Sequence, residues 1–105
     1  MNTLIVETLK DLKITTRYMK YDGNENEYII FTTTDSKDAF FCDDDNQAEI
    51  NTISLNFWYK DGRSFNKAKE IKKAMKNAGF IFINSADLMD GEYYGKNMMF
   101  KYLDI

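Results

Sequence analysis

The sequence predicts an α+β fold in which an antiparallel or mixed β-sheet of about four to five strands packs against two α-helices. The first observation is the alternation of apolar and polar side chains along residues 50–60, INTISLNFWYK, which is typical of a strand with one buried face. Such alternation favours antiparallel pairing, because parallel strands tend to be apolar on both faces. The second observation is that this strand is followed directly by a helical pattern over residues 64–78 and then by an apolar run over residues 80–83, which predicts a new strand.

The size and composition of the chain fit a single globular domain over residues 1–105. The formal net charge of −3 argues against general binding of nucleic acid, which needs a basic surface. No run approaches the ~18 apolar residues of a membrane-spanning helix, and we expect neither a signal peptide nor contact with a membrane. With one cysteine, Cys42, no internal disulfide can form, and we expect synthesis in the cytosol.

The N-terminal third of the chain predicts a helix followed by a β-hairpin. Residues 3–12 repeat apolar side chains at the spacing of a short amphipathic helix. Residues 14–21 are rich in β-branched and aromatic side chains, and the turn-forming residues 22–24 separate them from a similar run over residues 28–34. We therefore expect these two runs to pair as the strands of a hairpin.

Residues 35–49 form the ambiguous part of the sequence. Six acidic residues and one lysine give this segment a charge of −5, so we expect either a mobile loop or a flared hairpin arm. The run Asp43-Asp44-Asp45 faintly resembles the start of a calcium-binding loop, but Ala48 stands where that loop needs glycine. The interpretation that we favour is a hydrated acidic segment without a metal ion.

Residues 64–78 predict an amphipathic helix, with Ser64 as its N-cap and Gly79 as the first residue beyond its C-terminal end. Its apolar stripe consists of Phe65, Ala68, Ile71, Met75 and Ala78. Its other positions are mostly lysines, namely Lys67, Lys69, Lys72, Lys73 and Lys76. This lysine-rich face is either solvated, in contact with phosphates, or in contact with the acidic segment of a neighbouring subunit.

Two further stretches and one tryptophan complete the pattern. Residues 87–97 contain two glycines and three acids, and are expected to form an exposed loop. Residues 98–103 alternate again and predict a final strand. Trp58 lies on the polar side of the central strand, where it either packs beneath a loop or anchors an interface.

The sequence lacks the residues that most enzymatic mechanisms need. It contains no histidine, which excludes Ser–His and Cys–His nucleophile pairs as well as histidine metal sites. Its five glycines are dispersed and form no phosphate-binding loop, and Cys42 is expected to be an unreactive thiol. We therefore expect no catalytic residue, no cofactor and no metal, and we do not expect an enzyme.

Three segments carry a resemblance to a known family. The stretch DNQAEINTISLNFWYKD leads into a strand, SFNKAKEIKKAMKNAGF forms a helix that ends in Ala-Gly-Phe, and NMMFKYLD closes the chain with an aromatic–basic–aromatic pattern. This order resembles the tail-terminator (tail-completion) proteins of long-tailed bacteriophages and of prophages in Gram-positive hosts. The resemblance covers most of the chain, and it rests on patterns of residue class rather than on invariant chemistry.

The resemblance implies a structural virion protein with no enzymatic activity. In that family the chain forms a homohexameric ring that caps the finished tail tube and joins the tail to the head connector. The implied partners are other copies of the chain, the major tail tube protein and the head–tail connector protein, while DNA passes through without being specifically bound. The implied location is the head–tail junction of the virion, and the host cytoplasm during assembly.

Two other functions are compatible with the sequence. A different phage neck or head-completion protein would be similarly small, and a monomeric acidic adaptor or inhibitor would imitate nucleic acid with its surface. For any of these partners the candidate interface residues are Phe40, Phe41, Asp43, Asp44, Asp45, Trp58, Lys69, Lys72 and Lys76.

Overall fold

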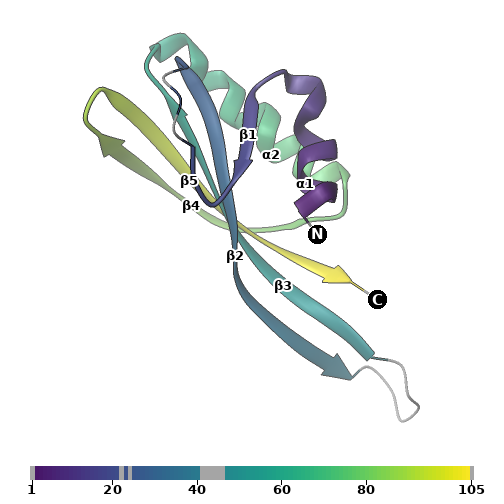
Figure 1. Cartoon of the computed structure of the whole chain (residues 1–105). Coiled ribbons are helices and arrows are strands. Elements are labelled where there is room, and N and C mark those ends of the chain that lie inside the picture. The colour runs from purple at the N-terminus through teal and green to yellow at the C-terminus, as the bar shows by residue number, and fades with distance from the viewer. Residues whose placement is uncertain (1, 22, 24, 41–46, 105) are drawn as a thin grey trace.

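The computed structural model describes residues 2–21, 23, 25–40 and 47–104 (Figure 1). In chain order the elements are α1 (Asn2–Leu9), the 3-10 turn η1 (Lys10–Leu12), β1 (Thr15–Tyr18), β2 (Glu27–Phe40), β3 (Gln47–Tyr59), the 3-10 turn η2 (Gly62–Asn66), α2 (Lys67–Asn77), β4 (Ile81–Asp90) and β5 (Tyr93–Asp104). The fold is α+β, as the sequence predicts.

The strands form one five-stranded sheet in the order β1-β2-β3-β5-β4, so β3 lies at its centre. β1 pairs with β2 in parallel, whereas the other neighbouring pairs are antiparallel. The prediction of an antiparallel or mixed sheet is therefore confirmed in its mixed form.

Both α-helices lie over the same face of the sheet (Figure 1). Along β3 the predicted alternation is confirmed, because Ile53, Leu55 and Phe57 are fully buried and the residues between them are half-buried. The helices contribute Ile5, Leu9, Ala68, Ile71 and Met75 to the same core cluster. The core is thus a single layer between one face of the sheet and one stripe of each helix.

The predicted hairpin between residues 14–21 and residues 28–34 is wrong. β1 and β2 run parallel, with Tyr18 opposite Phe31. The chain turns away from β1 at Met19, whose φ is 69° and whose N–H donates to the carbonyl of Phe31 at 2.9 Å. β2 begins beside the N-terminal end of β1, because Tyr28 lies opposite Thr15. The parallel pairing therefore excludes a hairpin between these two strands.

The predicted loop over residues 87–97 is also wrong. β4 and β5 form a tight hairpin in which Asp90 lies opposite Tyr93. Gly91 adopts a φ of 57° at the turn, a left-handed conformation that glycine reaches without steric cost. β4 is an edge strand with mostly exposed side chains, so it tolerates acids and shows no alternation that a sequence pattern would reveal.

β2 and β3 extend beyond the helices as a long hairpin arm (Figure 1). In this arm residues 35–40 lie opposite residues 47–52, after a register shift between Thr33 and Asp35. The hairpin-arm interpretation of residues 35–49 is therefore confirmed where the structure describes them, and the loop interpretation is wrong there. The arm makes the molecule elongated, with extents of 52 × 22 × 22 Å. Four candidate interface residues lie outside the described residues: Phe41, Asp43, Asp44 and Asp45.

The N-terminal end of the second helical region differs from the prediction. Asp61 caps η2 by accepting a hydrogen bond from the backbone N–H of Arg63 at 2.9 Å, and this bond, together with one from the Arg63 side chain, lowers the pKa of the Asp61 carboxyl. Ser64, the predicted N-cap, is instead buried and donates to the Glu27 carboxylate at 2.9 Å. A serine near the start of a helix can either cap the helix or bond to another element. Here the Ser64 hydroxyl bonds to Glu27 of β2 and is not the cap.

The prediction that Gly79 is the first residue beyond the C-terminal end of the helix is confirmed. Its φ of 98° is the left-handed conformation expected at this position. The N–H of Gly79 donates to the carbonyl of Lys76 at 3.1 Å, and the N–H of Phe80 donates to that of Met75 at 3.0 Å. These two bonds form a Schellman motif. The motif satisfies the last carbonyls of the helix and directs the chain into β4.

We predict that Phe57→Ala lowers the free energy of unfolding by about 3–5 kcal/mol, because the large side chain leaves a cavity in the core. Phe57 is fully buried on the helix-covered face of β3. The measurement is urea unfolding followed by circular dichroism. Thr52→Ala, on the open face of the same strand, is the control and should change stability by less than ~1 kcal/mol. Equal midpoints for the two variants would contradict this arrangement of the core.

Candidate interaction surfaces

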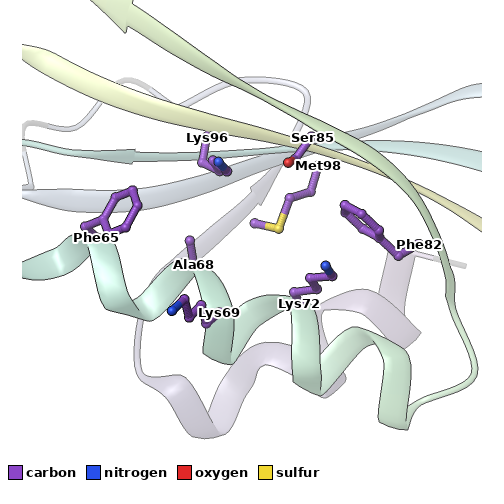
Figure 2. Close-up of a pocket in the computed structure, with 8 residues that line it drawn as sticks. All are labelled: Phe65, Ala68, Lys69, Lys72, Phe82, Ser85, Lys96 and Met98. Carbon is purple, nitrogen blue, oxygen red and sulfur yellow. The ribbon is translucent and has the colours of Figure 1, made fainter.

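A groove of about 190 Å³ runs between α2 and the β4–β5 hairpin (Figure 2). Its apolar side chains are Phe65, Ala68, Phe82 and Met98, and its polar side chains are Lys69, Lys72, Ser85 and Lys96. Figure 2 shows Met98 and Phe82 reaching from the sheet toward α2. Phe65, which the sequence placed on the buried stripe, lies in η2 and is half exposed at one end of this groove.

The lysines at this groove differ in their partners. Lys72 lies over the Phe82 ring, with Nζ 3.9 Å from the ring centroid, in a cation–π contact. Lys96 makes an ion pair with Asp87 at 3.1 Å. Lys69 makes no ion pair with any described residue. The rim of the groove therefore carries more positive than negative charge.

The lysine-rich side of α2 is continuous with this groove. A second depression of about 290 Å³ is lined by Lys69, Lys72, Lys73, Lys76 and Asn77. The structure thus brings the predicted interface residues Lys69, Lys72 and Lys76 together on one side of the helix. No described residue makes an ion pair with any of the four lysines. Whether this surface meets a partner stays a prediction.

Trp58 lies on the face of the sheet opposite the helices and is half-buried. It stands opposite Gly95 in the β3–β5 pairing. A Cβ built on Gly95 would come within 2.7 Å of the Trp58 ring and 3.1 Å of Leu88 Cβ, so the ring occupies the space that a larger residue would fill. Trp58 therefore packs across strand β5 rather than beneath a loop, and its role as an interface anchor stays a prediction.

The outer part of the arm carries a row of carboxylates that the sequence analysis missed. Asp38, Glu49 and Asp104 are register partners on the adjacent strands β2, β3 and β5. Residues opposite one another share a face of the sheet, here the helix-covered face, since buried Asn51 lies two positions from Glu49. All three are exposed. Only the pairing register brings Asp104 beside Glu49, so no local pattern could have indicated the row.

No basic residue in the described part of the chain forms an ion pair with these three carboxylates. Like charges placed directly opposite on neighbouring strands repel and destabilise the pairing. The predicted interface residue Phe40 is the last residue of β2, two positions beyond Asp38. The end of the arm is thus a strongly acidic surface that projects from the body.

The sheet has two edges without a partner strand among the described residues. β4 forms one edge and presents large apolar side chains, with Ile81, Ile83 and Met89 exposed by 61%, 40% and 73%. At the other edge β1 pairs with residues 28–31 of β2, which leaves residues 32–40 open on that side. Open strand edges of this length are ready templates for pairing with another chain.

The described residues contain no group of three or more acidic, histidine or cysteine side chains arranged to hold a metal ion. The Asp43-Asp44-Asp45 run lies outside this part of the chain. Among the helices that the structure describes, none is both long enough and apolar enough to cross a bilayer. The surfaces described above are therefore the candidate functional sites.

No protein-family model and no curated protein matches the chain. Among solved structures, the fold is shared with a chain from the virion of a native gene transfer agent (GTA) particle. The TM-score is 0.62 at 12% sequence identity, and the match covers 92% of this chain and 83% of that chain. This likeness establishes a common fold over nearly the whole domain, and membership in the tail-terminator family stays a prediction.

We predict that Gly95→Ala forces the Trp58 ring to move, because the new methyl group would lie 2.7 Å from two ring carbons. Steric overlap of this kind costs roughly 1–3 kcal/mol. Trp58 is the only tryptophan, so a change in emission maximum reports its displacement directly. Gly62→Ala is the matched control, because nothing lies within 4 Å of a Cβ there. Unchanged emission and stability in Gly95→Ala would contradict the packing described here.

Proposed function

We propose that this chain is a structural component of a phage or phage-like particle, without enzymatic activity. We propose that it forms a homohexameric ring that caps the tail tube and joins it to the head connector. The observation that supports this most is the fold shared with a chain of the GTA virion over most of both chains. The sequence patterns support the same function independently, because they resemble those of tail-terminator proteins.

The edges of the sheet support assembly into a ring. The β4 edge and the outer part of the β2 edge lie on opposite sides of the sheet and differ in sequence. A contact between two unlike edges is head-to-tail, and such contacts close into rings when the rotation between neighbours allows it. The exposed apolar residues of β4 would be covered in this arrangement, which removes them from water.

The charge of the chain supports passage of DNA without binding. Each chain carries a formal net charge of −3, so a ring of several copies is strongly acidic. Tight phosphate binding requires basic side chains that release counterions from the DNA. Helix α2 carries five of the 14 basic residues and only one acid, so the rest of the chain has a formal charge of −7 and the other surfaces of a ring would repel the DNA. The ring would be assembled in the host cytoplasm and retained at the head–tail junction of the virion.

We predict that the chain assembles to about six times its monomer mass of 12.4 kDa, either alone or on isolated tail tubes. The measurement is light scattering of the chain with and without tubes, combined with electron microscopy of tube ends. Tubes without the chain are the control. A ring that binds head connectors but not tubes would indicate a different neck protein. A chain that stays monomeric under all these conditions would indicate an adaptor or inhibitor instead.

A further inference from the structure

We propose that the groove between α2 and the β4–β5 hairpin receives the carboxylate row Asp38–Glu49–Asp104 of a second copy of this chain. This contact rests on the self-association proposed above, and it specifies which two surfaces meet. The groove is the receptor and the outer end of the arm is its occupant. Each copy would then offer its groove to one neighbour and its arm to another.

The groove has the chemistry of a receptor for carboxylates. Lys69 and Lys72 stand beside a floor that includes Ala68, Phe82 and Met98. An ammonium group held against an apolar floor is less hydrated than one in open water, so its attraction to a carboxylate is stronger. Lys72 is also held in place by its contact with the Phe82 ring, 3.9 Å from Nζ. A cation fixed in this way loses little conformational entropy when it binds an anion.

The arm end has the complementary charge and is left without an ion-pair partner among the described residues. Asp38, Glu49 and Asp104 lie side by side on three adjacent strands, and no described basic residue forms an ion pair with them. Their mutual repulsion disfavours this register in an isolated subunit. Lysines from another chain would relieve the repulsion and satisfy the carboxylates at the same time.

The geometry requires that the two surfaces come from different copies. The arm points away from α2 and from the β4–β5 hairpin (Figure 1), and α2 itself packs against α1 and β4. An arm that extends past its own helices can reach a neighbour's groove without any change in the fold. Because groove and arm are different surfaces, the contact is head-to-tail and is compatible with a closed ring.

The experiment uses two full-length variants, Lys69→Glu/Lys72→Glu in the groove and Asp38→Lys/Glu49→Lys in the arm. Each variant alone places like charges at every contact between copies. In an equal mixture, alternating copies restore opposite charges at every contact, because the reversed groove meets the reversed arm and the native groove meets the native arm. Lys13→Glu/Lys20→Glu, at exposed positions outside α2 and outside the groove, makes the same change in net charge as the groove variant and is its control.

We expect each variant alone to need at least about tenfold more protein for half-assembly, as the loss of close charge pairs at an interface does. The mixture and the control should assemble as the wild-type chain does, and the wild-type assembly should weaken with added salt. Circular dichroism and thermal unfolding verify that the variants are folded. Lys69→Glu alone, which breaks no ion pair with a described residue, provides a second groove variant that leaves the Lys72–Phe82 contact intact.

The outcomes separate this contact from the proposed function. If the wild-type chain assembles and both variants assemble equally well, or if mixing restores nothing, the proposed contact is wrong and the ring is held by other surfaces. If the groove variants assemble normally but no longer bind tail tubes, the groove serves the tube protein and the contact is again wrong. If the wild-type chain never assembles, alone or on tubes, both the contact and the proposed ring are wrong.

Discussion

The burial of one face of β3 beneath α1 and α2 is the constraint on which the rest of the structure depends. Ile53, Leu55 and Phe57 have no exposed surface, and four of their six register partners on β2 and β5 are buried apolar residues, namely Ile29, Phe31, Met98 and Phe100. A domain of this size has only one such layer to offset the conformational entropy of the chain. Every strand that pairs with β3 is therefore held to a single register.

That register also shapes the surface. A slip of one residue would move the whole apolar set of a strand to the open face, so the pairing of β3 with β2 and β5 is strongly specified. The same pairing places Trp58 over Gly95 on the open face and aligns Asp38, Glu49 and Asp104 along the arm. The acidic row thus follows from the pairing of β3 with β5, together with the register shift between Thr33 and Asp35 on β2. Repulsion within it is tolerated because the register is already determined by the buried residues.

The molecule divides into a covered body and an uncovered arm, and this division connects fold to assembly. In the body, helix packing stabilises the sheet, whereas beyond the helices the arm is held by strand pairing. The groove beside α2 offers lysines over an apolar floor, and the arm offers carboxylates. In the proposed contact each of these surfaces would meet groups of opposite charge on a second chain.

The sequence by itself determined the features that repeat locally: the alternation of β3, the apolar stripe of α2 from Ala68 to Met75, and the end of that helix at Gly79. Each depends on a periodicity or on a backbone conformation that a few neighbouring residues encode. The tertiary structure decided the parallel pairing of β1 with β2, the continuation of β4 through residues 87–90, the contact of Ser64 with Glu27, and the arm surface. These features depend on which strands become neighbours. Several arrangements of the strands satisfy the local preferences equally well, and long-range packing selects one of them.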